Sequence, residues 1–173
     1  MTLTVPDDVV ARAAHCLDLA RNQGVSVAFG ESLTGGLIAA TFTAVPGASD
    51  VVVGGVIAYA TGLKEQLLGV DGALLDRVGA VHSEVAAEMA RGAAVRLGAD
   101  IGVSCTGVAG PDPQDGHPAG TVHVALHHGG GPDVARSFTA EGDRAAVRLA
   151  TVAAAIDLLH NHLTGPGGRP RQS

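Results

Sequence analysis

The chain contains very few aromatic residues, lysines and cysteines, and these shortages exclude several classes of protein. Phe, Tyr and Trp make up 2% of the 173 residues, so the core must be built from Ala, Val, Leu and Ile, a composition that suits helices packed on a sheet. Two cysteines provide neither a disulfide framework nor a zinc site. A net charge of −6 disfavours a general nucleic-acid or anionic-membrane surface.

The chain also lacks a recognisable membrane-spanning or secretory segment. No run approaches the roughly 20 apolar residues that cross a bilayer. The first residues, MTLTVPDD, have neither the basic region nor the apolar run of a signal peptide. We therefore expect a soluble, cytoplasmic protein.

Hydrophobic periodicity predicts helices that alternate with strands. The predicted helices cover residues 7–23, 33–44, 63–68, 83–97 and 143–160, and the predicted strands cover 25–29, 51–59, 100–105, 121–127 and 134–140. Gly54 and Gly55 predict a bulge in the second strand. This order predicts an α/β fold, a three-layer α/β/α sandwich with a mixed five- or six-stranded sheet. We expect a single domain over 1–163 and a disordered tail over 164–173.

Residues 30–36, GESLTGG, place a hydroxyl at the junction between a predicted strand and a predicted helix. Ser32 is a candidate nucleophile for a carbonyl carbon, because the first free N–H groups of the helix would face the oxyanion that forms. Gly35 and Gly36 would let a ligand approach the backbone closely. Glu31 could hold a ligand hydroxyl, pair with an arginine or stabilise the helix N-terminus. The alternative is an ordinary strand–turn–helix corner with Ser32 as N-cap.

A second strand end repeats part of this sequence. Ser104-Cys105-Thr106-Gly107 ends the predicted strand over 100–105. The two strand ends could face one cleft at the carboxyl edge of the sheet, where ligands of α/β folds bind. The loop that follows contains Pro111 and predicts no helix, so this end lacks helix N–H donors. We therefore prefer Ser32 as the nucleophile and interpret Cys105 as a small buried residue.

Lys64 is the only lysine of the chain and is the candidate for a base. Arginine stays protonated at neutral pH, whereas a desolvated lysine can lose its proton. Tyr59, the only tyrosine, lies five residues earlier at the end of an apolar strand and could assist proton transfer. The eight histidines show no metal-ligand spacing, and none stands out as a partner for Ser32. A surface lysine near a tyrosine at the sheet edge is the alternative interpretation.

Arg144 and Arg148 share one face at the start of the last predicted helix, since they are four residues apart. Two guanidinium groups there could bind a phosphate or a carboxylate. A solvated helix face with Asp143 as its cap is an equally good interpretation.

Seven stretches together resemble the CinA C-terminal family, whose characterised members are nicotinamide-nucleotide amidohydrolases. They occur in the family's order over about residues 8–160 and are specific as a set. The stretches are GESLTGG at 30–36, VPGAS at 45–49, GGVIAY at 54–59 with Lys64, GAVHSEVAAEMA at 79–90, TGVAGPD at 106–112, PAGTV at 118–122 and GDRAAVR at 142–148. The resemblance implies the stand-alone form of this family, without the N-terminal nucleotide-binding domain of its larger members.

The resemblance implies hydrolysis of the carboxamide of nicotinamide mononucleotide to nicotinate mononucleotide and ammonia, without a metal or other cofactor. It implies Ser32 as nucleophile, Lys64 as base and Tyr59 as an assisting group. It also implies a homodimer that binds a small nucleotide. The net charge argues against nucleic acid or a membrane as a partner. The residues implied to bind substrate are Glu31, Leu33, Thr34, Gly35, Gly36, Thr106, Gly107 and Arg144.

Some positions depart from the family's pattern. Leu33 replaces a cysteine beside the nucleophile, and Gly30 replaces an alanine. His82 replaces a serine, and His117 stands where a cation is usual, so substrate preference is less determined than reaction type. Two alternatives therefore stay open: an amidase for a different small substrate, and a non-catalytic nucleotide-binding or interaction protein.

Overall fold

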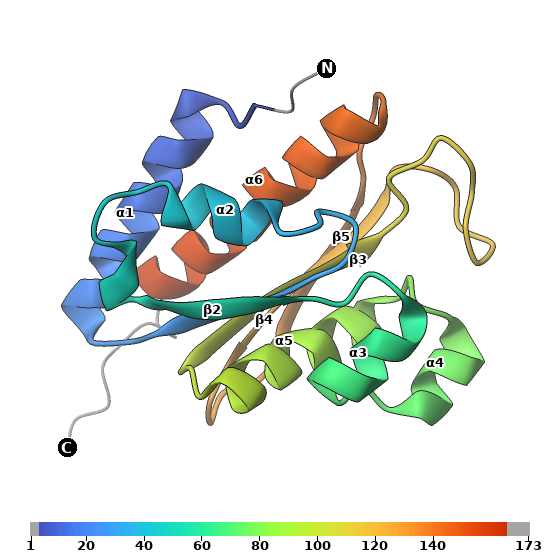
Figure 1. The fold of residues 1–173 in the computed structure, drawn as a ribbon, viewed down its shortest axis with the longest axis horizontal. Helices are drawn as coiled ribbons and strands as arrows, with labels where there is room; N and C mark the ends of the chain where they lie inside the picture. Colours follow the sequence, from blue (N-terminus) through green and yellow to red (C-terminus); the bar gives the residue numbers. More distant parts are fainter. Residues whose placement is uncertain (1–3, 166–173) are drawn as a thin grey trace.

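A mixed sheet of five strands separates two layers of helices in the computed structural model, which describes residues 4–165 (Figure 1). Helices α1, α2 and α6 cover one face of the sheet, and α3, α4 and α5 cover the other (Figure 1). The predicted α/β/α sandwich is thereby confirmed. The elements are α1 (Asp7–Gln23), β1 (Val27–Glu31), α2 (Leu37–Thr43), a 3₁₀ turn η1 (Ala48–Asp50), β2 (Val52–Ile57), α3 (Thr61–Leu68), α4 (Gly72–Val78), α5 (Ser83–Leu97), β3 (Ile101–Gly107), β4 (Thr121–His128), β5 (Val134–Thr139) and α6 (Arg144–Thr164).

The strand order is β2-β1-β3-β4-β5, with β1 parallel to both neighbours and the later pairs antiparallel. The chain leaves β1 toward β2 on one side and later returns to β3 on the other side. Such a reversal of strand order opens a crevice at the carboxyl ends of the strands. The fold therefore brings the ends of β1 and β3 to one place.

Small residues allow the helices to lie close to one another and to the sheet in a core with little aromatic volume. A Cβ added to Gly92 of α5 would lie 1.8 Å from the Leu68 carbonyl oxygen, and one added to Gly102 of β3 would lie 1.9 Å from that of Ala90. Both contacts are shorter than any real Cβ contact, so only glycine fits. On the other face Phe29 and Phe42 stack with ring centroids 5.0 Å apart.

Several predicted boundaries are wrong. The helix predicted over 33–44 begins at Leu37, because Gly35 and Gly36 have φ angles of 60° and 93°, which a helix cannot include. The irregularity in β2 lies opposite the Val27/Ala28 step, where the register skips Val53, one residue before the glycines. Helix α4 was not predicted.

The last helix extends beyond its predicted end at residue 160. Helix α6 continues to Thr164, so the predicted tail begins inside a helix. Residues 166–173 of that tail lie outside the described part of the chain. No helix within residues 4–165 is long and apolar enough to cross a membrane.

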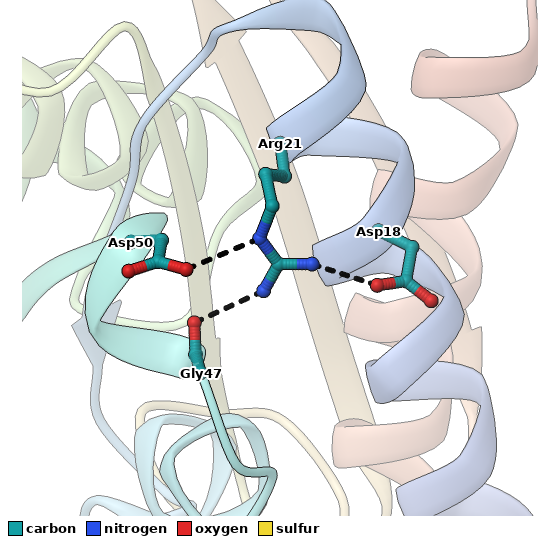
Figure 2. Close-up of polar contacts among 4 residues, drawn as sticks. All are labelled: Asp18, Arg21, Gly47 and Asp50. Atoms are coloured by element: carbon teal, nitrogen blue, oxygen red, sulfur yellow. Dashed lines mark hydrogen bonds and ion pairs between the residues drawn. The ribbon is translucent and has the colours of Figure 1, made fainter.

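Arg21 of α1 ties the connection between α2 and β2 to the helical layer (Figure 2). Its guanidinium donates to Asp18 Oδ1 at 2.7 Å, to Asp50 Oδ2 at 3.3 Å and to the Gly47 carbonyl oxygen at 3.0 Å. The group is solvent-exposed, so it fixes the path of this loop more than it adds stability.

Candidate active site

The ends of β1 and β3 meet at one pocket, as their sequences predicted. Glu31 pairs with Cys105 in the parallel ladder, so Ser32 follows β1 directly beside the end of β3. The pocket is surrounded by residues from both strand ends, from α3 and the start of α6, from the loop after β3, and from the connections before α3 and before α5. They are Ser32, Leu33, Tyr59, Lys64, Ala80, Val81, Thr106, Gly107, Val108, Ala109, Gly110, Asp112, Gln114 and Arg144.

Lys64 lies against Ser32 inside this pocket. Its Nζ is 3.0 Å from Ser32 Oγ and donates to the Ala58 carbonyl oxygen at 2.8 Å and, at 3.4 Å, to that of Tyr59. Helix α3 brings Lys64 back across the end of β2, and only 1% of the residue is exposed. The contact between lysine and serine satisfies the geometric requirement for a nucleophile and its base.

Burial makes Lys64 a weaker base than an ordinary lysine, and more of it is neutral near physiological pH. Loss of hydration lowers the pKa of its ammonium group from 10.5 to about 8, while the negative charges of Cys105 and Asp115 act in the opposite direction. Cys105 exerts this effect only as a thiolate. Because burial raises the pKa of the Cys105 thiol to about 11, its contribution is small at neutral pH.

Cys105 is a buried structural residue, in agreement with its interpretation from sequence. It has no exposed surface, and its sulfur lies 3.0 Å from Thr34 Oγ1. The pKa of its thiol is raised by burial and by the carboxylate of Glu31, so the reactive thiolate is disfavoured. Ser104 is equally inaccessible, and its hydroxyl donates to the Ala86 carbonyl oxygen at 2.6 Å.

Glu31 stabilises the start of α2, the simplest of the three roles that its position suggested. Its carboxylate is buried and accepts four hydrogen bonds, from Thr34 Oγ1 at 2.6 Å and from the backbone N–H groups of Gly36, Ile38 and Ala39 at 3.0, 3.1 and 2.8 Å. Glu31 is absent from the residues that line the pocket within the described chain. The N–H groups predicted to face an oxyanion are therefore already occupied.

Ser32 is not the N-cap of α2, because Gly36 holds that position. Thr34, Gly35 and Gly36 support the turn after Ser32 but do not line the pocket formed by residues 4–165. Arg148 donates to the Thr34 carbonyl oxygen at 2.6 Å from the side of α6. This arginine therefore holds the turn, and only Arg144 of the predicted pair lines the pocket.

Tyr59 and Arg144 form the mouth of the pocket. Arg144 donates to the Tyr59 hydroxyl at 2.8 Å and to the Gly110 carbonyl oxygen at 3.0 Å. The tyrosine is 57% exposed, and its phenol makes no hydrogen bond to Ser32 or Lys64 within the described residues. The backbone carbonyl of Tyr59, and not its ring, contacts the lysine.

Thr106 and Gly107 line the pocket where β3 ends. The Thr106 hydroxyl donates to the Ala80 carbonyl oxygen at 2.7 Å. A Cβ on Gly107 would lie 2.4 Å from the Thr121 carbonyl oxygen, so this wall position requires glycine. Neither His82, which caps α5, nor His117 belongs to the pocket lining within residues 4–165.

Sequence reasoning missed Asp112 and Gln114, which line the pocket from the loop after β3. It also missed Asp115, whose Oδ2 lies 3.4 Å from the Ala80 N–H and whose charge acts on Lys64. This loop has no apolar periodicity, so only its polar composition after a strand end could have drawn attention to it.

Comparison with known proteins yields a consistent set of relatives. The family model described as the CinA C-terminal domain matches residues 10–163. A CinA-like protein of Frankia casuarinae is 47% identical over 151 residues, which cover 86% of this chain and 34% of that protein. A CinA-like protein of Geobacter sulfurreducens is 42% identical over 163 residues, which cover 91% of this chain and 39% of that protein. The chain thus spans about a third of the length of these curated relatives.

Solved structures share the fold over nearly their whole length. The competence/damage inducible protein CihA of Agrobacterium tumefaciens superposes with a TM-score of 0.88 at 34% identity, covering 95% of this chain and 100% of that one. A CinA superfamily protein of Escherichia coli superposes with a TM-score of 0.85 at 30% identity, covering 92% of this chain and 93% of that one.

Proposed function

Because the chain belongs to the CinA C-terminal domain family, we propose that it is an amidohydrolase in which Ser32 attacks a carboxamide and Lys64 accepts the serine proton. The substrate we propose is nicotinamide mononucleotide, hydrolysed in the cytoplasm to nicotinate mononucleotide and ammonia. The observation that carries this proposal is the distance of 3.0 Å between Lys64 Nζ and Ser32 Oγ in a buried setting that lowers the pKa of the lysine.

The first half of the reaction forms an acyl-enzyme. The Ser32 oxygen bonds to the carboxamide carbon while its proton passes to the neutral amine of Lys64. The tetrahedral intermediate then collapses, the bond from carbon to nitrogen breaks, and Lys64 returns the proton to the leaving nitrogen, which departs as ammonia.

The second half releases the acid. A water molecule attacks the ester carbon while Lys64 takes one of its protons, and the bond to Ser32 breaks as the serine is reprotonated. One amide and one water thus give one carboxylate and one ammonium ion, since the released ammonia takes up the proton of the carboxylic acid. Lys64 is the only lysine of the chain, and Arg144 at the mouth stays protonated and cannot take this role.

Arg144 is the candidate for holding the phosphate of the substrate. It lies at the pocket mouth with its guanidinium directed to Tyr59 and Gly110 by hydrogen bonds of 2.8 and 3.0 Å. Arginine presents several donors to a phosphate at once. In this arrangement the amide reaches Ser32 past Thr106 and Gly107, and the phosphate stays at the rim.

Ammonia release from nicotinamide mononucleotide by purified protein, with EDTA present, tests the proposed function. We expect ammonia and nicotinate mononucleotide in equal amounts. A folded protein without turnover on this nucleotide or on related amides would contradict the proposal and favour the nucleotide-binding alternative, which a thermal-shift screen of nucleotides would then detect.

We also propose that two copies associate through the edge strand β2. Asp50 is the only charged residue between Ser32 and Leu63, and Arg21 already pairs with it. Strand β2 exposes Val53 and Ile57 at 49% and 50% and carries none of the charges that usually protect an edge strand. Residues near a two-fold axis meet their own copies, so a charge there would face a like charge, and an uncharged edge strand suits a second copy of the same chain.

Sedimentation velocity tests this association. Ile57→Lys would place a charge in the contact, and we expect it to convert a dimer into monomers. Val134→Lys on β5, the opposite edge of the sheet and 41% exposed, is the matched control and should leave the dimer intact. A wild-type chain that sediments as a monomer, or an Ile57→Lys variant that stays dimeric, would contradict the proposal.

A further inference from the structure

The turn after Ser32 leaves one backbone N–H group unused. The turn is closed by a hydrogen bond of 3.0 Å from the Gly35 N–H to the Ser32 carbonyl oxygen. The N–H groups of Ser32 and Thr34 face the sulfur of Cys105. Within residues 4–165, the N–H of Leu33 has no hydrogen-bond partner.

The donors further along the chain are all occupied. Glu31 accepts from Gly36, Ile38 and Ala39 at distances of 2.8 to 3.1 Å. The remaining N–H, that of Leu37, lies 3.4 Å from the Thr34 carbonyl oxygen. The short helix α2 therefore offers no free donor to a ligand, and the reaction must use another group.

We infer that the backbone N–H of Leu33 is the donor that stabilises the oxyanion formed when Ser32 attacks its substrate. This inference rests on the proposed function. Leu33 directly follows the nucleophile and lines the pocket, and the N–H after a nucleophilic serine is the position from which other serine hydrolases build an oxyanion hole. An unpaired donor of this kind needs no rearrangement when the negative charge develops.

Glu31 is a positioning residue in this arrangement. A carboxylate only accepts hydrogen bonds, which matches its four donors. By holding the turn through Thr34 and Gly36, it fixes where the Leu33 N–H lies relative to Ser32. Glutamine in its place would set an NH₂ group against one of these N–H groups, so the turn would shift.

Leu33→Pro tests the inference because proline removes this N–H together with the buried leucine side chain. Leu33 is the second residue of a four-residue turn, a position that favours proline. Proline also requires a negative φ angle, and Leu33 is not among the described residues with a positive φ. Leu33→Ala is the matched control, since it removes the same side chain and keeps the N–H.

We expect kcat of Leu33→Pro to fall about 10²–10³-fold below that of Leu33→Ala, with KM changed little. A folded Leu33→Pro variant with kcat within tenfold of the alanine control would overturn the inference. Should thermal melting show that proline prevents folding, an ester bond at position 33, introduced with the α-hydroxy analogue of leucine, removes the same N–H and is compared with the wild type by the same criterion.

A second measurement separates this inference from the proposed substrate. A fluorophosphonate labels an activated serine: a bond from Ser32 oxygen to phosphorus forms, fluoride leaves, and the serine proton passes to Lys64. Its phosphoryl oxygen uses the same donor as a carbonyl oxygen. We expect mass spectrometry to show labelling about 100-fold slower in Leu33→Pro than in Leu33→Ala. Equal labelling rates would overturn the role of Leu33 whether or not nicotinamide mononucleotide is the substrate.

Discussion

Strands β1 and β3 run side by side in the same direction, and each is associated with a Ser-x-Thr-Gly sequence. In the first, Ser32 lies just past the strand end, lines the pocket and contacts Lys64 at 3.0 Å. In the second, Ser104 lies inside β3, is fully buried and donates to a backbone carbonyl. Similar residues therefore acquire different roles from a shift relative to the strand end and from the position of one lysine.

Replacing Ser32 at the end of β1 and Cys105 near the end of β3 should produce the largest contrast between these strand ends. We expect Ser32→Ala to fold and to lose roughly a thousandfold or more in kcat, because no acyl-enzyme can form. Cys105→Ala, at the end of β3, should keep kcat within about tenfold while lowering the melting temperature, since it removes a buried side chain. Ammonia release and thermal melting measure both. Full turnover by Ser32→Ala would contradict the mechanism.

Lys64→Met should have the next largest effect, because it removes the base and keeps a buried chain of similar length. We expect kcat to fall by about 10²–10⁴-fold. In the wild type the neutral amine is the active form, so kcat/KM should rise with pH through about 8, the pKa that burial gives this lysine, and then level off.

The pH profile distinguishes a base from a structural lysine. The residual activity of Lys64→Met should lose the rise near pH 8, while a structural role would lower activity equally at every pH. A wild-type profile that falls as pH increases through this range would contradict the assignment of Lys64 as the base.

Tyr59→Phe should have the smallest effect. Its hydroxyl accepts one hydrogen bond from Arg144 and contacts neither Ser32 nor Lys64 within the described chain. We therefore expect KM to rise about two- to tenfold, because Arg144 loses a neighbour that orients it, with little change in kcat. A fall in kcat as large as that of Lys64→Met would instead show that the Tyr59 hydroxyl takes part in the proton transfer.

The comparison of the strand ends also explains where sequence reasoning succeeded. Buried strands alternating with helices predict a sandwich, and glycine and hydroxyl residues after strands indicate a pocket at the carboxyl edge. Ser32, Thr106 and Gly107 lie together at this edge as these patterns suggested, and Lys64 and Arg144, which the family resemblance implied, line the same pocket.

The wrong predictions concern the directions of side chains and of the backbone, which a sequence pattern does not contain. Glu31 and Thr34 belong to the same heptapeptide as Ser32, yet within the described chain they do not line the pocket. Instead, the Thr34 hydroxyl donates to the Glu31 carboxylate at 2.6 Å. Two consecutive glycines with positive φ delay the helix to Leu37, and a helix period cannot show this. The polar loop after β3 has no period at all, so Asp112 and Gln114 could not be placed at the pocket.

The sequence by itself determined the fold class and the choice of Ser32 over Cys105. It also determined that Lys64 is the only side chain besides histidine that could serve as a neutral base. Composition, periodicity and the single lysine are local or countable properties, so the sequence alone contains them. Only the tertiary structure decided that Lys64 reaches Ser32, that burial lowers its pKa, and that Glu31 occupies the helix donors and leaves the N–H of Leu33 unpaired. The Lys64 contact and its pKa depend on residues far apart in the chain and on the exclusion of water, which arise only when the layers pack together. The Glu31 contacts are local, but they depend on the backbone path of the turn, which two glycines with positive φ set.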